Sequence, residues 1–285
     1  MRDAMATEFP SEHVVIIRPT RGWVPVNLRE LWAYRELLYF LVWRDLKVRY
    51  KQTVLGVVWV VIQPLFMMLV FTFLFGTIAR IDTDPLPYAL FVFVGLLPWN
   101  LFAKGLSEGS TSLVANENLI RKVYFPRLIL PAAAVISGLV DFVIGFIPLA
   151  GVMIYYRYPL LLAPALLALP LLVVLTVVAA SGIAFWLSAI DARYRDVRYT
   201  LTFLTSLWLF ATPVVYPLTS VPSNLRWLYS LNPMTGIVEG FRWSLFGSAW
   251  NFDVISGISM AAVVVLFIGG LFYFRRTERI FADVV

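Results

Sequence analysis

Few side chains in this sequence have the chemistry of a catalytic site. There is one histidine, His13, and no cysteine. A Ser-His triad, a His-based metal site or a thiolate nucleophile therefore lacks its essential residues in the apolar part of the chain. No glycine is followed by lysine, so the phosphate-binding loop G-x-x-x-x-G-K-[ST] is absent as well. The sequence predicts a protein that is not an enzyme, holds no cofactor or metal, and does not bind ATP through this loop.

Polar side chains inside apolar stretches are the next candidates. Asp141 is the one carboxylate well inside such a stretch, where a charge costs roughly 2.5 to 3.5 kcal/mol on insertion scales. It either faces a pathway through the membrane or makes a structural hydrogen bond. Gln63 precedes Pro64 in another apolar stretch, where proline frees a backbone carbonyl and glutamine adds an amide. This pair predicts either a kink that faces the protein interior or a position that lines a pathway.

A basic segment between two apolar stretches has the composition of a docking surface. A short helix is expected to begin after Asn116 and to end near Pro126. It would present apolar and cationic side chains together: Leu119, Ile120, Arg121, Lys122, Val123, Tyr124 and Phe125. This mixture suits contact with a soluble partner. A simple cationic anchor on the cytoplasmic side of a membrane would carry the same charge.

The composition places these residues in a membrane protein. Hydrophobic residues make up 60% of the 285 residues and charged residues only 14%, and the mean hydropathy is +0.81. Soluble domains are about half apolar, and a soluble core could not bury this much apolar surface. The formal charge of +6 fits Lys and Arg at membrane borders, so nucleic acid is not an expected partner.

Six apolar stretches are long enough to form transmembrane helices. About 20 helical residues are needed to cross about 30 Å of hydrocarbon. The expected spans are residues 55–78, 88 to about 107, 129–156, 160–190, 199–216 and 254–274. Gly105 and Gly109, near the end of the second span, have the spacing that lets membrane helices approach closely. The expected fold is an all-α integral membrane protein with a six-helix transmembrane domain over residues 55–274.

The segments around this domain have distinct characters. Residues 1–54 are comparatively polar and are expected in the cytoplasm. Their part from about 28 to 51 has a helical period and is predicted to be an amphipathic helix along the membrane interface, with packing on protein as the alternative. Residues 217–253 are apolar but broken by proline and glycine, which predicts short re-entrant helices between spans five and six. Residues 275–285 are expected to form a cytoplasmic tail.

The distribution of Lys and Arg predicts the orientation. Cytoplasmic connections of membrane proteins carry the excess of these residues. If the chain starts inside, only Arg80, Arg157, Arg226 and Arg242 of the 23 Lys and Arg fall in outside connections. Both termini are therefore expected in the cytoplasm.

Three segments together resemble the type 2 ABC exporter permeases, particularly those that export O antigen, capsule or teichoic acid polymers. They read RDLKVRYKQTVLGVVWVVIQPL at 44–65, ENLIRKVYFPRLILP at 117–131 and LNPMTGIVEGFRW at 231–243. The resemblance covers nearly the whole chain and departs from the family in the longer polar N-terminus and in Asp141. It implies a homodimeric permease of the bacterial cytoplasmic (inner) membrane. A separate ATPase subunit would bind ATP and dock on the cytoplasmic loops and the N-terminal region.

The resemblance also implies a substrate, a lipid-linked cell-surface polysaccharide such as the O antigen of lipopolysaccharide. Sugar C–H faces stack on aromatic rings, and sugar hydroxyls pair with amides and hydroxyls. The candidate pathway residues are Trp59, Gln63, Phe66, Asp141, Trp208, Thr212, Tyr216, Trp227, Tyr229 and Trp243. Those of the first and fifth spans have helical spacing, and we expect the two copies of these faces to meet across the dimer axis. For any single ring, core packing or an interfacial aromatic belt is the alternative.

Other functions are weighed against export of a polymer. Within the same family, a permease for a small molecule or drug is the alternative. A passive channel or a membrane scaffold is an alternative of a different class, which co-purification of an ATPase would exclude. An intramembrane transferase lacks the clustered carboxylates or histidines that its chemistry needs.

Overall fold

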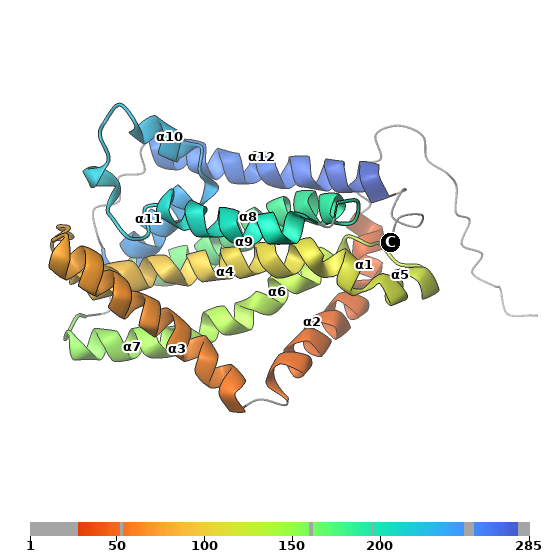
Figure 1. Ribbon diagram of the computed structural model, residues 1–285, viewed down its shortest axis with the longest axis horizontal. Helices are drawn as coiled ribbons and strands as arrows, with labels where there is room; N and C mark the ends of the chain where they lie inside the picture. Colours follow the sequence, from red (N-terminus) through yellow and green to blue (C-terminus); the bar gives the residue numbers. More distant parts are fainter. Residues whose placement is uncertain (1–27, 52–53, 160–161, 195, 248–253, 279–285) are drawn as a thin grey trace, which may run out of the picture.

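The computed structural model describes residues 28–51, 54–159, 162–194, 196–247 and 254–278 (Figure 1). His13 and the expected C-terminal tail beyond residue 278 lie outside this part of the chain. Within it the regular structure is entirely helical. The helices are α1 (Leu28–Ala33), α2 (Arg35–Tyr50), α3 (Val54–Phe71), the π-helical η1 (Thr72–Ile78), α4 (Tyr88–Ala115), α5 (Glu117–Lys122), α6 (Ile129–Ile144), α7 (Phe146–Tyr155), α8 (Leu162–Asp191), α9 (Val197–Phe210), the 3-10 turn η2 (Leu218–Ser220), α10 (Arg226–Ser230), α11 (Pro233–Phe246) and α12 (Val254–Thr277).

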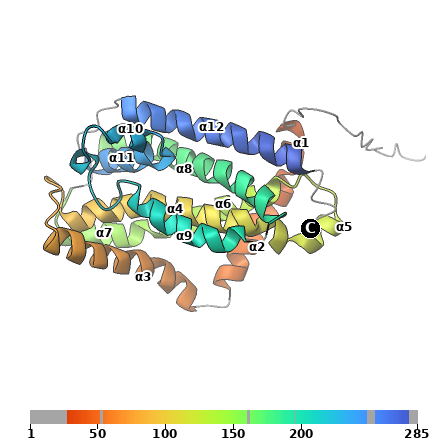
Figure 2. The ribbon, with the colours of Figure 1, turned by 45° about the horizontal axis from the view of Figure 1, so that its top comes forward.

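Helix α4 lies at the centre of the bundle. It packs against α8, α6, α11, α3 and α9, and both ribbon views show it between these neighbours (Figure 2). In its most apolar stretch 83% of the residues are buried, against 17% in that of the span Val58–Ile78, which comprises most of α3 and all of η1. A helix that is apolar on all sides is expected to be covered on all sides, so α4 provides most of the core.

Small residues allow the central helices to approach closely. A Cβ atom on Gly109 would lie 2.7 Å from the Cβ atom of Ala184 in α8, and one on Gly105 would lie 3.0 Å from that of Ala180. Distances this short leave no room for a side chain. The close approach predicted from the spacing of the two glycines is therefore confirmed, and α8 is the neighbour.

Five helical stretches in the described residues are long and apolar enough to cross a membrane. They are Val58–Ile78, Tyr88–Ala115, Ile129–Tyr155, Leu167–Asp191 and Val254–Thr277. Each coincides with an expected span, although the second continues as helix beyond its expected end near residue 107. The third is a broken helix, in which α6 and α7 meet at Gly145.

The expected span at residues 199–216 differs from the structure. Helix α9 ends at Phe210 and has 14 residues, which gives a rise of about 21 Å, less than the hydrocarbon thickness. The chain then turns through Pro213 and Pro217. Proline lacks an amide hydrogen and disfavours a helical residue before it. Hydropathy alone does not detect this end, because residues 211–216 remain mostly apolar.

The two ends of the bundle carry different elements. Helices α1, α2 and α5 lie near one end, and η1, α10 and α11 lie near the other (Figures 1 and 2). At the first end a separate apolar cluster includes Leu41 of α2, Ile120 of α5, Phe125 and Phe274 of α12. This cluster fixes the N-terminal helices and the basic segment after α4 to the bundle.

Candidate functional site

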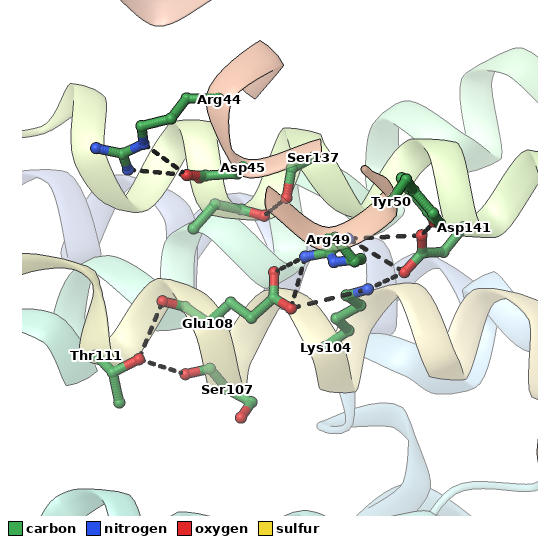
Figure 3. Close-up of polar contacts among 11 residues, drawn as sticks. Arg44, Asp45, Arg49, Tyr50, Lys104, Ser107, Glu108, Thr111, Ser137 and Asp141 are labelled. Atoms are coloured by element: carbon green, nitrogen blue, oxygen red, sulfur yellow. Dashed lines mark hydrogen bonds and ion pairs between the residues drawn. The ribbon is translucent and has the colours of Figure 1, made fainter. Parts of the chain in front are cut away.

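A cluster of charged side chains joins α2 to α4 and α6 (Figure 3). The Arg49 guanidinium contacts Glu108 with Nη2 to Oε2 at 2.7 Å and Asp141 with Nη1 to Oδ2 at 3.3 Å. Lys104 forms an ion pair with Asp141 and lies 3.7 Å from Glu108 Oε1. The Tyr50 hydroxyl donates a hydrogen bond to Asp141. Two cations therefore balance two carboxylates inside the bundle.

The helical spacing explains how α4 contributes two members of this cluster. Lys104 and Glu108 are four residues apart, so they lie on one face of α4, and α2 supplies Arg49 from its last turn. The side chain of Asp141 is only 13% exposed. Of the two roles that the sequence allowed for Asp141, the structure supplies the partners for the structural one. Removing a partner from a fully buried pair costs about 3 to 5 kcal/mol, and partial exposure lowers this figure.

The sequence alone did not indicate the other members of the charged cluster. The available signal was a lysine and a glutamate four residues apart at the end of an apolar stretch. Their partners, Arg49 and Asp141, are 92 residues apart in the chain, and only the fold brings them together.

A cavity of about 460 Å³ lies beside the cluster, between α2, α4 and α6. Its charged lining consists of Arg44, Asp45, Arg49 and Glu108. Arg44 pairs with Asp45 at 2.8 Å and donates to the Asn116 side-chain oxygen at 2.8 Å. Charges of both signs therefore line this cavity in pairs, and neither sign is in excess.

A second hollow of about 220 Å³ lies between α3, α4 and α9, and we call it the polar groove. Its polar lining is Gln63 of α3, Asn100 of α4, and Thr205 and Ser206 of α9, among apolar side chains. Gln63 and Asn100 are exposed in the single chain. Polar groups on membrane helices need hydrogen-bond partners or water. This groove is therefore a place on the apolar surface where a polar molecule would be stabilised.

The exposed face of α3 borders the polar groove. Trp59 and Phe66 are each 63% exposed, and Gln63 lies between them on the same face, as the helical spacing predicts. The structure thus brings together the three candidates of the first span. Within the part of the chain that the structure describes, both rings remain mostly uncovered.

The candidates of the fifth span, unlike those of the first, are wholly or partly buried. Trp208 is half-buried, and its indole nitrogen donates to the Asn232 side-chain oxygen at 3.1 Å. Thr212 is fully buried, and it accepts a hydrogen bond at 2.9 Å from the Asn232 side-chain nitrogen. These two residues fasten α9 to the start of α11. Of the threonine and serine side chains of this region, Thr205 and Ser206 line the polar groove, whereas Thr212 does not.

Of the remaining candidates, Tyr216 and Tyr229 contact each other, and Trp227 and Trp243 are not part of this pair. The hydroxyls of Tyr216 and Tyr229 are 2.8 Å apart, and their rings meet edge to face. Trp227 is 59% exposed on α10, and Trp243 is half-buried on α11. The Tyr216–Tyr229 pair lies beyond the end of α9, at the same end of the bundle as α10 and α11.

The basic segment after α4 divides into a buried and an exposed part. Ile120 and Phe125 are buried in the apolar cluster at this end of the bundle, with Leu119 half-buried against it. Arg121 and Lys122 are exposed. The short helix predicted after Asn116 is confirmed as α5, which ends at Lys122.

Two exposed side chains complete the surface of this segment. Val123 is 52% and Tyr124 61% exposed. Partial burial and the nearby carboxylates of Glu30 and Glu278 raise the pKa of the Tyr124 hydroxyl. The hydroxyl therefore stays protonated at neutral pH and remains a hydrogen-bond donor. We call Arg121, Lys122, Val123 and Tyr124 the α5 surface.

Comparison with known proteins identifies the family of this chain. A model described as ABC-2 type transporter matches residues 36–246. The O-antigen export system permease protein RfbA of Myxococcus xanthus is 33% identical over 258 residues, which are 88% of this chain and 96% of the relative. A protein of the same name from Klebsiella pneumoniae is 26% identical, covering 88% of this chain and 95% of that protein. The polysialic acid transport protein KpsM of Escherichia coli is 24% identical, covering 82% and 91%.

The match of the family model includes α3, α4, α5, α9 and α10, and with them the polar groove, the α5 surface and the Tyr216–Tyr229 pair. It spans most of the chain, and the Myxococcus relative is aligned over nearly its whole length. The chain belongs to the ABC-2 type transporter family.

Proposed function

We propose that this chain is the membrane-spanning permease subunit of a bacterial exporter that carries a lipid-linked cell-surface polysaccharide across the inner membrane. Relatives aligned over most of its length are named as O-antigen export permeases and a polysialic acid transport protein. The structural observation that carries the proposal is the polar groove of Gln63, Asn100, Thr205 and Ser206 beside exposed rings. A sugar polymer needs both hydrogen-bonding groups and ring faces along its path.

A second copy of the chain is proposed to enclose this path. The polar groove opens toward the outside of the single chain, next to exposed apolar side chains such as Phe66 of α3 and Phe203 and Leu207 of α9. The hydroxyls of Thr205 and Ser206 donate to carbonyls of α9, but lipid tails cannot satisfy the side-chain amides of Gln63 and Asn100. A homodimer in which these faces meet would seal the conduit from lipid and keep its polar lining hydrated.

The proposed topology has six crossings with both termini in the cytoplasm. Helix α9 with the turn after it makes the fifth crossing, and α10 and α11 re-enter the outer leaflet. Helices α1 and α2 lie along the inner interface. Their exposed aromatic side chains, Trp32, Tyr39, Phe40 and Trp43, support this placement because tryptophan and tyrosine favour the headgroup region.

A separate ATPase subunit is proposed to dock on the α5 surface. Cations next to exposed Tyr124 and Val123 suit an interface with a soluble protein. The segment is also tied to the end of α12. The Arg127 backbone N–H donates to the Glu278 carboxylate at 3.1 Å, and the Arg127 guanidinium donates to the Glu278 carbonyl at 2.7 Å. The chain that follows the α5 surface is therefore bonded to the residue directly after α12.

Deleting the gene in its host tests the proposed function. We expect the surface polysaccharide to disappear and lipid-linked polymer to accumulate inside the cell, with both effects reversed by a plasmid copy. A plasmid copy with Tyr124→Asp is the matched control for coupling, since it should insert normally and yet fail to restore export. Unchanged surface polysaccharide in the deletion strain would reject the proposal.

A further inference from the structure

The turn that follows α9 has an unusual hydrogen-bonding arrangement. Residues 211–215 are non-helical, and 212–215 are buried, so their carbonyls have no helical partners. The Thr212 carbonyl accepts from the Val214 backbone N–H at 2.7 Å, and side chains from other elements donate to three of the other carbonyls. The Asn232 amide donates to the Ala211 carbonyl at 3.1 Å, Arg242 donates to the Val214 carbonyl at 2.8 Å, and the Tyr88 hydroxyl donates to the Val215 carbonyl at 2.6 Å. Non-helical backbone within a membrane protein persists only where such partners exist.

Arg242 is the central donor of this arrangement. Its side chain is only 1% exposed, although it carries a charged group. It lies on α11, most of whose residues are buried. Besides the Val214 carbonyl it donates to the Phe91 carbonyl of α4 at 3.3 Å, and its guanidinium lies 3.5 Å from the centre of the Phe91 ring. Glu239 on the same helix pairs with it at 3.0 Å. One side chain thus joins α11, α4 and the turn.

Gly95 in α4 makes room for this guanidinium. A Cβ atom at position 95 would lie 2.9 Å from Nη2 of Arg242, the atom that bonds Val214, and 3.3 Å from the Val214 carbonyl oxygen. Even one methyl group would therefore push the arginine or the turn away from α4. Position 95 has no side chain, and Arg242 is buried. Both observations indicate that the space beside Gly95 accommodates the guanidinium of Arg242.

We propose that Arg242 is a positioning residue that holds the turn after α9 against α4, and so fixes the Tyr216–Tyr229 pair at the outer end of the conduit. The first part stands on geometry alone. The role of the tyrosine pair in export rests on the proposed function. The physical reason for an arginine is its planar fork of donors, which can bond two carbonyls and stack on a ring at once. Lysine has a single nitrogen and cannot make all three contacts.

The chain contains no cysteine, so a single introduced thiol can report whether the turn is docked. Val215→Cys is the reporter, because Val215 is fully buried in the turn. The complete transporter in lipid nanodiscs without ATP is treated with a charged, water-soluble thiol reagent. We expect slow labelling in the otherwise unchanged chain and at least tenfold faster labelling when Arg242→Gln or Gly95→Ala is added. Arg242→Lys should give an intermediate rate.

Three controls separate positioning from general stability. Gly151→Ala adds a methyl group where nothing lies within 4 Å, and Ser244→Ala removes a buried hydroxyl that bonds only within α11; both should leave the rate at Val215→Cys unchanged. Val135→Cys, buried on α6, should stay unreactive in every background. Equal acceleration at both reporters would overturn the proposal, as would labelling of Val215→Cys within twofold of the unchanged chain in Arg242→Gln.

If Arg242→Gln does not reach the membrane, Gly95→Ala tests whether Arg242 holds the turn against α4. It keeps every donor and adds one methyl group, and an unchanged labelling rate in this variant would also overturn the proposal. Because labelling is measured without ATP or substrate, its outcome does not depend on what the transporter exports. A failed deletion phenotype and a failed labelling experiment are therefore distinguishable.

Discussion

The guanidinium of Arg49 in α2 lies 2.7 Å from the carboxylate of Glu108 in α4, 59 residues further along the chain. This ion pair fastens the helix proposed to lie at the membrane interface to the central helix of the bundle. Movement of α2 must therefore either break the pair or carry α4 with it.

Arg49→Gln should destabilise the folded permease. The substitution removes charge-assisted hydrogen bonds to Glu108 and Asp141, each of which contributes about 1.5 to 3 kcal/mol when well formed, and partial exposure of these side chains reduces that figure. We expect a loss of about 1 to 3 kcal/mol, measured as a lower midpoint of thermal unfolding in detergent. Arg35→Gln is the control. Arg35 is exposed, and its contacts among the described residues are local: it donates to the Trp32 carbonyl and lies over the Trp32 ring, so its replacement should change little.

A double-mutant cycle isolates the Arg49–Glu108 pair. If the two side chains interact directly, Arg49→Gln combined with Glu108→Gln should lose less stability than the sum of the single changes, with a coupling energy of about 1 kcal/mol. Strict additivity would mean that the pair does not connect the two helices.

Changes on the α5 surface should separate docking from folding. Tyr124→Asp, or Arg121→Glu with Lys122→Glu, should reduce co-purification of the ATPase, since losing an interface anchor costs about 2 kcal/mol or more. Insertion and thermal stability of the permease should stay normal. Phe125→Ala is the contrasting variant. Phe125 is buried, so this change should lower the stability of the permease itself.

Full ATPase binding and full export by the charge-reversed α5 variants would remove this surface from the coupling mechanism. A loss of permease in the membrane, with no specific loss of binding, would show that the exposed side chains stabilise the fold instead.

Gly182→Ala should disrupt the packing of α8 on α12. A Cβ atom at position 182 would lie 2.6 Å from Cα of Phe267, a backbone atom that no side-chain rotation can move. Overpacking of this kind costs about 1 to 3 kcal/mol, measured by the yield and thermal unfolding of the purified protein. Gly257→Ala on α12 has open space around it and should behave like the unchanged chain. Equal stability of both variants would contradict the packing described for α8 and α12.

Hydropathy and periodicity predicted most of the helices because their cause is local. About 20 apolar residues in sequence are sufficient to predict a span, and α4, α8 and α12 follow from that rule. The end of α9 could not be predicted in this way. Thr212 and Tyr216 continue the four-residue spacing of Trp208 only if the helix continues, and it ends at Phe210. The donors that stabilise the turn, Asn232 and Arg242, lie in a segment far along the chain.

The candidate site was predicted only in part, because sequence spacing relates residues of one helix and not residues of different helices. Trp59, Gln63 and Phe66 share a face because they lie on one helix. Asn100 and Ser206, which border the same groove as Gln63, come from other helices, and sequence spacing carries no information about their approach. The basic segment was recognised by its composition, but its division into buried Phe125 and exposed Tyr124 depends on contacts with α12 and α2.

The topology is tested by reporters at two connections. Because Lys and Arg gather on one side of the predicted spans, a reporter fused after Arg193 should be cytoplasmic and one fused after Asn251 should lie outside. The fifth crossing must be made by α9 and its turn for both results to hold. A cytoplasmic signal at the later position would leave five crossings, since α9 would then not cross.

The central claim, that the polar groove lines the conduit of a polysaccharide exporter, is tested most directly by thiol labelling during transport. Gln63→Cys, Asn100→Cys and Ser206→Cys are introduced singly into the cysteine-free chain, with Ile154→Cys, which is 77% exposed on α7, as a surface control. The account predicts that a water-soluble reagent labels the three groove positions in the working transporter, that exported polymer slows this labelling, and that a bulky adduct there stops export. The control lies on the exposed face of the span Ile129–Tyr155, so it should react with a lipid-soluble reagent, without effect on export. Groove positions that react only with lipid-soluble reagents, while export continues after modification, would contradict the account.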